Sequence, residues 1–292
     1  RSRETFNGAQ LFSFLAKKVV IPKYGFPVDV ASLDVSQEAS GSEVDLDRDL
    51  QLAIAEYAPG EKIVANGAIW ASEGLKIEAS KELPVYRSWK CEGCGAYYAE
   101  KALLYDKDSL CKICDSTKKT AVDTFVEPIF GFLGKKMPEK PGDKRPPGTV
   151  STYSYFNDYA QATPDFDALI FEGKIIETRI SAHGQITVVT SPANHWHICL
   201  KCGYAHRERG PLPSKEAHEQ PNRFRQSECN NFLKRMGLGH QFRTDVMEIK
   251  LPINAKWEEM QSALQAILVA TPAIGIDSKD VNGTLRSTGR NS

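Results

Sequence analysis

The spacing of apolar residues along the chain predicts three helices. Residues 8–20, 46–57 and 257–270 each place their large apolar side chains on one helical face. Asp45 is expected to cap the second of these helices, and the Ala-Pro-Gly sequence at 58–60 is expected to end it. The side chains that this spacing turns inward in the last helix are Met260, Leu264, Ile267 and Leu268.

Alternation of apolar and polar residues predicts strands elsewhere. Residues 28–35 and 240–253 alternate, and 61–74 form a hairpin that turns at Asn66-Gly67. Residues 168–190 are typical of two or three strands with turns near Gly173 and Gly184, and a short run at 230–239 looks helical. The pattern therefore predicts short strands with a few helices.

Composition adds limits to this picture. The 292 residues are 41% hydrophobic and 25% charged, as in a soluble globular protein, and 37 basic residues balance 37 acidic ones. Whole-chain charge therefore favours no class of partner. No apolar run approaches the length of a membrane-spanning helix, and the first residues contain no signal sequence. We expect a cytoplasmic location, no membrane partner, and, because no initiating Met is present, a chain that belongs to something longer.

The seven cysteines fall in two clusters, and the first resembles a zinc ribbon. It has two CxxC pairs separated by sixteen residues, and Gly95 follows the first pair, where a tight turn needs a small residue or positive φ. Two such pairs can close a tetrahedron of thiolates around a structural Zn²⁺. An iron–sulfur cluster, a redox dithiol and four unrelated buried cysteines are the alternatives. The predicted ligands are Cys91, Cys94, Cys111 and Cys114.

The second cluster, Cys199, Cys202 and Cys229, lacks a fourth ligand. His218 lies in the polar stretch that returns to Cys229, so it can complete a second pair of ligands. The other candidates are His195, His197, His206 and His240. The site could also hold no metal, with Cys229 simply buried, or it could be a catalytic zinc with an open position. A catalytic zinc needs an acidic or basic side chain, such as a carboxylate, beside that position. The sequence His-Trp-His-Ile-Cys at 195–199 has no carboxylate where an H-x-E signature would place one. We therefore expect two structural zinc ions.

Basic residues flank the second cluster and suggest contact with DNA phosphates. A solvated loop surface is the alternative, because the excess of positive charge is modest. The segment 134–149 is a second basic stretch, rich in proline and glycine, and is expected to be a mobile loop. The predicted nucleic-acid-binding residues are Arg207, Arg209, Arg223, Arg225, Lys234 and Arg235.

Nucleotide-binding and hydrolase motifs do not occur in the sequence: it has no G-x-x-x-x-G-K-[ST], G-x-G-x-x-G, H-E-x-x-H or G-x-S-x-G. A chain with two metal-binding clusters and none of these motifs is more typical of a binding or scaffolding module than of an enzyme. An independent zinc enzyme would need an open coordination position.

Several short sequences, taken in order, resemble a known family. Residues 22–30, 46–60 and 65–75 resemble the segment after the motor domains of certain bacterial superfamily 2 helicases. Residues 197–205 and 238–251 resemble the zinc-binding, helicase-associated C-terminal region of those proteins. Mitomycin-repair helicases and proteins of the DISARM and Druantia phage-defence systems share this region.

The resemblance extends from Leu15 to Gly283, and it implies that His218 and Cys229 follow the Cys199–Cys202 pair as ligands. The ATPase lobes, the Gly-rich D-x-x-x-G-G segment and the further cysteine cluster of those proteins are not found in this sequence. The resemblance therefore implies a helicase motor as partner, in cis or as a separate subunit, and gives this chain itself no ATPase.

These observations predict an α+β fold: an antiparallel β-rich body with a few helices, an inserted zinc ribbon and a second zinc-knuckle subdomain. The predicted segments are 1–83, 84–125 (the ribbon), 126–190 (β-rich, with the basic loop 134–149) and 191–292. The predicted function is a non-catalytic accessory region of a DNA helicase in repair or phage defence. The alternative is a protein-docking subunit without DNA contact, using exposed aromatic side chains. Those side chains would be Tyr97, Tyr98, Tyr153, Tyr155 and Phe156.

Overall fold

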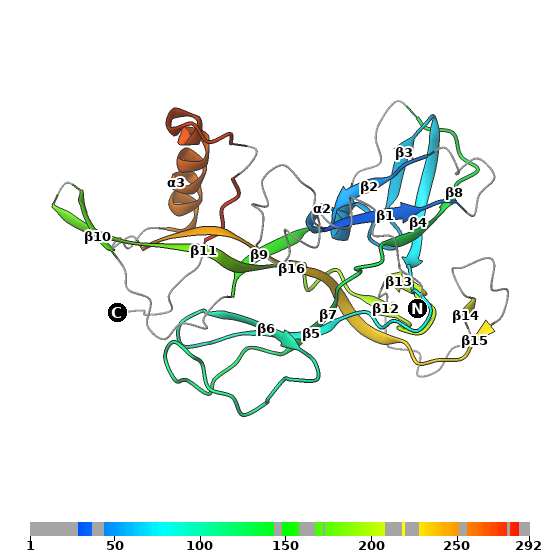
Figure 1. Cartoon of the computed structure of the whole chain (residues 1–292), viewed down its shortest axis with the longest axis horizontal. Coiled ribbons are helices and arrows are strands. Elements are labelled where there is room, and N and C mark those ends of the chain that lie inside the picture. The colour runs from blue at the N-terminus through cyan, green and yellow to red at the C-terminus, as the bar shows by residue number, and fades with distance from the viewer. Residues whose placement is uncertain are drawn as a thin grey trace, which may run out of the picture.

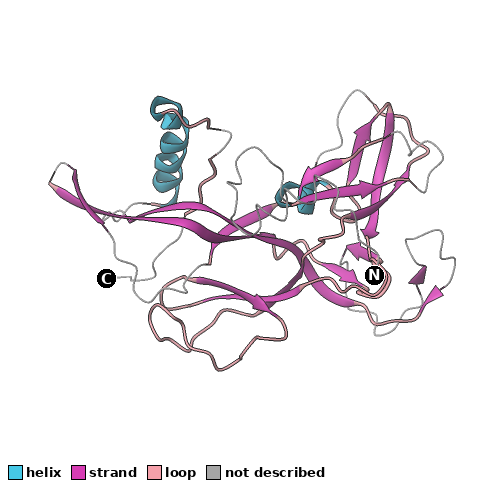
Figure 2. Ribbon diagram, viewed as in Figure 1, coloured by secondary structure: helices cyan, strands magenta, loops and turns pink. Residues whose placement is uncertain are grey.

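The computed structural model describes residues 29–36, 44–142, 148–157, 167–171, 173–207, 218–219, 228–250, 256–278 and 281–285. The described residues form an α+β fold dominated by strands, as the sequence pattern predicts (Figures 1 and 2). The helix predicted at 8–20 lies outside them. Neither helix in the described part of the chain has the length and apolar character needed to cross a bilayer.

A five-stranded sheet forms the N-terminal part, in the order β2-β1-β8-β4-β3. β1 pairs with β8 in parallel, and the other neighbouring strands are antiparallel. Helix α2 follows β2 and packs on this sheet. The elements are β1 (Val30–Asp34), β2 (Asp47–Asp49), α2 (Leu50–Glu56), β3 (Lys62–Ala65), β4 (Ala68–Leu75) and β8 (Phe132–Lys136).

Local sequence explains two features of this sheet. Asn66 and Gly67 have φ of 47° and 68°, so the predicted β3–β4 turn is confirmed as a tight hairpin. The predicted cap of α2 is wrong. Asp49, not Asp45, accepts a hydrogen bond from the Gln51 amide, because residues 47–49 pair with β1 before the helix begins.

A larger sheet contains the remaining long strands, in the order β10-β11-β16-β7-β5-β6. β12 joins it through β16, β13 pairs with β12, and β9 pairs with β11. A separate two-stranded sheet consists of β14 and β15. The bounds are β5 (Val85–Lys90), β6 (Tyr97–Lys101), β7 (Asp123–Val126), β9 (Thr152–Phe156), β10 (Asp167–Phe171), β11 (Lys174–Thr190), β12 (Trp196–Ile198), β13 (Ala205–Arg207), β14 (His218–Glu219), β15 (Glu228–Cys229) and β16 (Lys234–Lys250).

β11 and β16 form a long antiparallel ribbon that crosses the middle of the molecule in Figure 1. The predicted turn near Gly184 is wrong, because β11 continues through it with only a register shift between Ser181 and Gly184. The helical interpretation of 230–239 is also wrong from Lys234 onward. Gly239 gives the reason: a Cβ there would lie 2.4 Å from the Phe125 ring, so this stretch packs closely as a strand.

The basic segment 134–149 is only partly a loop. Gly134 to Lys136 belong to β8, where Gly134 packs against Leu33 and Val35, and the irregular part begins at Met137. Residues 143–147 lie outside the described residues.

One apolar core joins the two sheets. Tyr57, Trp70 and Phe132 come from the N-terminal sheet and its helix, and Trp196 and Leu238 come from the larger sheet. The Trp196 indole N–H also donates to the Pro59 carbonyl across this contact, at 2.9 Å. The core therefore fixes β12 and β16 against the N-terminal sheet. The predicted division of the chain into four segments stays a prediction.

The predicted last helix is confirmed as α3 (Trp257–Ala270), followed by the 3₁₀ turn η1 (Thr271–Ile274). Its expected inward face is only partly covered. Met260, Leu264 and Leu268 are half-buried, and Leu264 packs against Gly283, but Ile267 is 46% exposed. Figure 1 shows α3 at the end of the molecule away from the N-terminal sheet.

A buried histidine links the start of β1 to β16. The His240 Nδ1 lies 2.6 Å from the Glu127 carboxylate, and its Nε2 lies 3.5 Å from Asp29. Glu127 also accepts from the Tyr86 hydroxyl and the Gln241 amide. Burial alone would lower the pKa of His240, but the two carboxylates outweigh it and raise the pKa above its ordinary value.

Replacing this histidine should therefore destabilise the protein in a pH-dependent way. Because the pKa of His240 is higher in the folded protein than in the unfolded chain, where it is about 6.5, its protonation stabilises the fold fully at pH values below about 6.5. This stabilisation is lost as the pH rises through the folded-state pKa. We expect His240→Gln to lower the free energy of unfolding by about 3 kcal/mol at pH 6. Urea denaturation of both proteins should show a smaller difference at pH 9, and an equal difference at both pH values would contradict the charged interaction.

Candidate metal centres

Four cysteine sulfurs converge in the first cluster. The Cys91 and Cys114 sulfurs lie 3.5 Å apart, and those of Cys94 and Cys111 lie 3.6 Å apart. A disulfide would bring two sulfurs to about 2.05 Å, so these are free thiols. A tetrahedral ion with bonds of about 2.3 Å to sulfur separates its ligands by about 3.8 Å. The cluster therefore has the size of a four-thiolate metal site.

The three CxxC pairs fold in the same way. In each, the amide that follows the second cysteine donates to the carbonyl of the first at 2.9 Å, from Gly95 to Cys91, Asp115 to Cys111 and Gly203 to Cys199. These donors have φ of 71°, 54° and 83°. A residue in the left-handed backbone conformation at this position lets the chain reverse direction while both cysteine sulfurs stay on the same side of the turn. Glycine suits it, and Asp115 is a residue type that tolerates it.

Strands position the first cluster. β5 leads into Cys91 and β6 leaves after Cys94, while an isolated bridge between Cys91 and Lys119 closes the second pair onto the first. The Tyr98 hydroxyl accepts from the Lys112 amide at 2.9 Å and lies 3.2 Å from the Cys111 sulfur. This tyrosine thereby ties the second CxxC turn to β6.

The second cluster brings three cysteines and a histidine together. The Cys199 and Cys229 sulfurs lie 3.9 Å apart, and the Cys202 sulfur lies 3.3 Å from the Nε2 of His218. His218 and Cys229 sit directly opposite each other in the β14–β15 pair, and the Tyr204 ring stacks on the imidazole. In both clusters the four ligand atoms lie within 4.8 Å of one another. The structure thus groups the eight residues that the sequence analysis names.

The other histidine candidates lie outside this group. His195 Nε2 lies 2.9 and 3.0 Å from the two Asp123 carboxylate oxygens, and His240 binds Glu127. His197 and His206 face each other across β12 and β13, with ring centroids 4.9 Å apart. The choice among the five histidines depends on the strand pairing of β14 and β15, which spacing along the chain suggests but does not fix.

Electrostatics in the two clusters matches a site built for a cation. The Cys202 thiol lowers the pKa of Cys199 to about 4, and Cys199 in turn raises the pKa of Cys202. Burial alone would raise the pKa of Cys111, but the Tyr98 hydroxyl and nearby amides lower it to about 6. Burial raises the pKa of Cys94 to about 12. Thiols this close cannot all ionise alone, and a bound cation would remove that conflict.

The donor sets determine what such an ion can do. The first group supplies four thiols, and the second supplies three thiols and one imidazole. Four protein ligands fill a tetrahedral ion and leave no position for a water molecule. The two groups could hold metal ions in a structural role, and neither has the arrangement of a catalytic centre.

Gly203 attaches the second cluster to the N-terminal sheet. Its carbonyl accepts from the Leu75 amide at 2.8 Å, and Tyr204 forms a bridge with Gly74. A Cβ on Gly203 would lie 1.9 Å from the Leu75 carbonyl oxygen. Only glycine permits this approach, so the metal cluster and the core are fixed to each other at this point.

The predicted phosphate-binding residues have different surroundings. The Arg207 guanidinium is held by hydrogen bonds to Thr149 and Asn194 and lies 3.9 Å from Glu61. Lys234 is exposed at the start of β16. Arg209, Arg223 and Arg225 lie outside the described residues.

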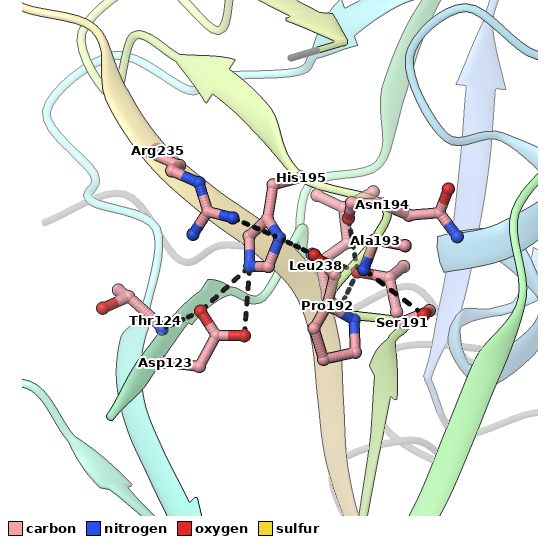
Figure 3. Close-up of polar contacts among 10 residues, drawn as sticks. Asp123, Thr124, Ser191, Pro192, Ala193, Asn194, His195, Arg235 and Leu238 are labelled. Atoms are coloured by element: carbon pink, nitrogen blue, oxygen red, sulfur yellow. Dashed lines mark hydrogen bonds and ion pairs between the residues drawn. The ribbon is translucent and has the colours of Figure 1, made fainter. Parts of the chain in front are cut away.

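Arg235 belongs to a polar cluster that sequence reasoning missed. Figure 3 shows its guanidinium beside His195, 3.3 Å from Nδ1, with Asp123 on the other side of the imidazole. Burial alone would raise the pKa of Asp123, but His195 and Arg235 lower it. Asp123 and His195 are 72 residues apart in the chain. No sequence spacing signals such a contact, which depends on the pairing of β16 with β7.

Comparison with known proteins gives one informative match. The chain is 24% identical over 280 residues to Druantia protein DruE of Escherichia coli (strain UMEA 4076-1). The match covers 86% of this chain and 15% of DruE, so the chain spans about a seventh of the length of that protein. No protein-family model matches the chain, and no solved structure matches it significantly. The chain is thus similar to one part of that protein, and its described residues contain two clusters that could hold metal ions.

Substitution of Gly203 tests the attachment of the second cluster. Gly203→Ala adds a clash with the Leu75 carbonyl to the strain of a left-handed residue, whereas Gly60→Ala, at φ of 95° with no atom nearby, adds strain alone. That strain costs about 1–2 kcal/mol. We expect Gly203→Ala to lose clearly more stability than Gly60→Ala in urea denaturation and to bind less metal. Equal losses in the two variants would contradict the close packing.

Proposed function

We propose that the chain is a non-catalytic, zinc-binding accessory region of a DNA helicase or translocase that acts in anti-phage defence. The observation that carries the proposal is the match to DruE over 86% of the chain, combined with two closed ligand sets in this chain. DNA repair is the other setting in which such a region would work. The partner motor would be joined in cis or supplied by a separate subunit.

Zinc fits both donor sets better than the alternatives. Zn²⁺ takes four thiolates or three thiolates and an imidazole in a tetrahedron, and the sulfur separations agree with that size. An iron–sulfur cluster also uses thiolates, but its irons and sulfides need more room than a single ion. We propose a cytoplasmic location as well, where reducing conditions would keep the cysteines available as ligands.

The basic residues beside the second cluster would supply contact with DNA phosphates. Lys234 is the clearest candidate among the described residues because it is exposed and follows Leu233, which packs with the cluster. Arg207 is less available, because Thr149 and Asn194 already occupy its guanidinium. Arg209, Arg223 and Arg225 remain predictions from the sequence.

Docking to the motor is the second candidate function. It is favoured by an exposed apolar surface at the end of the molecule that carries α3, which we call the distal end. Trp257 and Ile267 lie exposed on α3, and Ile180 and Met247 face each other, both exposed, across β11 and β16. The five aromatic side chains that the sequence suggests for docking support it less. Tyr97 and Tyr98 are buried in strand packing, and Tyr153 alone of the five is exposed.

Metal content tests the zinc assignment directly. We expect two zinc ions per chain in the purified protein and about one in His218→Ala, measured by elemental analysis, because an incomplete ligand set binds zinc weakly. His206→Ala is the matched control: it removes a neighbouring histidine that lies outside the ligand group and should leave two. Two ions in His218→Ala would exclude this histidine as a ligand.

Salt dependence tests the DNA contact. If Lys234 neutralises a phosphate, the slope of log affinity against log salt concentration should become shallower by about one in Lys234→Ala. Lys250→Ala, at the opposite end of the same strand, should leave the slope unchanged. The absence of DNA binding at low ionic strength would contradict the DNA-binding proposal and leave docking as the function to test.

A further inference from the structure

The two metal clusters differ in their access to solvent. Cys199, Cys202, His218 and Cys229 are all buried. In the first cluster Cys91 and Cys111 are buried, but Cys94 is only partly covered and Cys114 is exposed. The second cluster is therefore buried, whereas the first has one ligand cysteine, Cys114, at the surface.

Packing around the clusters explains the difference. The second cluster lies with Leu233 and Tyr204 and is attached to β4 through Gly203. The first cluster packs with Trp89, Ala96 and Tyr98, and with the partly buried Tyr105. Cys114 lies between the exposed residues Ile113 and Asp115 and is itself exposed, so this cysteine is at the surface.

We infer that Cys114 is a modification site at which a peroxide oxidises the first cluster and releases its metal, while the second cluster keeps its own. This inference rests on the proposed zinc binding. Thiolates are oxidised according to their exposure, and apolar surroundings keep oxidants away from buried ones. The exposed sulfur is therefore the first to react, and its position decides which cluster opens.

The chemistry proceeds in two balanced steps. The Cys114 thiolate attacks one oxygen of hydrogen peroxide; a sulfur–oxygen bond forms, the oxygen–oxygen bond breaks and hydroxide leaves, giving a sulfenic acid. The Cys91 thiolate then attacks that sulfur, a disulfide forms and a second hydroxide leaves. Peroxide accepts the two electrons, and solvent protons neutralise both hydroxides. Zn²⁺ is left with two thiolates, too few to hold it.

Cys91 is the partner because of its position. Its sulfur lies 3.5 Å from that of Cys114, and Gly93 packs against both sulfurs, with its amide donating to Cys91 at 3.3 Å. A disulfide needs the sulfurs to approach to about 2.05 Å. The two belong to different CxxC turns, so the bond would hold these turns together after the metal has gone.

Zinc release from the whole 292-residue chain tests the inference. The zinc-loaded protein is treated with hydrogen peroxide in the presence of a metallochromic dye, and the oxidised cysteines are mapped by mass spectrometry. We expect one zinc per chain to be released, with a Cys91–Cys114 disulfide. The second zinc should be released only after a mercurial reagent binds its thiolates, and Cys199, Cys202 and Cys229 should stay unoxidised throughout the peroxide treatment.

Two matched variants separate the role of Cys114 from a general loss of stability. Cys114→His keeps a zinc ligand but has no thiolate to oxidise, so peroxide should release zinc at least about tenfold more slowly. Lys112→Ala changes an exposed side chain in the same turn that is not a ligand, and it should leave the peroxide-driven release at its normal rate. Circular dichroism of each variant checks its folding.

Three outcomes would overturn the inference: release of both ions at one rate, first oxidation in the buried cluster, or unchanged release from Cys114→His. Each leaves the proposed function intact, since it requires only that zinc is bound. A chain that binds no zinc before peroxide is added would overturn the proposed function, and this inference with it.

Discussion

The structure depends on the packing of β12 and the start of β16 against the N-terminal sheet. Trp196, Ile198, Met236 and Leu238 enter a core whose other side is supplied by Trp70 and Phe132. Gly203 makes this contact possible, because a Cβ there would clash with the Leu75 carbonyl of the N-terminal sheet. Gly237 and Gly239 make room for Thr190 and Phe125 within the larger sheet. The apolar contact fixes the second metal cluster in place, whereas the first cluster lies outside this core and depends on its own ligands and on β5 and β6.

Much of the candidate site follows from the sequence, because CxxC spacing is a local property. A CxxC pair brings two sulfurs together through one turn, whatever the rest of the fold does, so three of the four ligand pairs need no tertiary information. The pair of His218 and Cys229 is different. It depends on strand pairing, which spacing only suggests. Spacing favoured His218 over four other histidines, and the resemblance to helicase-associated regions supported the same choice.

The fold was predictable where local signals dominate and not where distant packing does. Asn66-Gly67 fixes its hairpin through backbone conformation alone, and α3 follows from the apolar spacing. Gly184 looks like a turn in sequence, yet β11 runs through it because β16 pairs along its length. Likewise, the charge of Arg207 suggests an available cation, but Thr149 and Asn194 occupy it from distant parts of the chain.

The length of the β11–β16 ribbon sets the distance between the second metal cluster and the apolar surface near α3. Each strand has 17 residues, which corresponds to about 55 Å from end to end. The exposed lysine beside the second metal cluster and the apolar surface near α3 lie at opposite ends, so two large molecules could occupy both without touching. Adding two residues to each strand would lengthen this spacer by about 7 Å and keep every side chain on its face, whereas adding one would turn the distal apolar surface to the other side. The separation between the two ends is therefore adjustable only in steps of two residues.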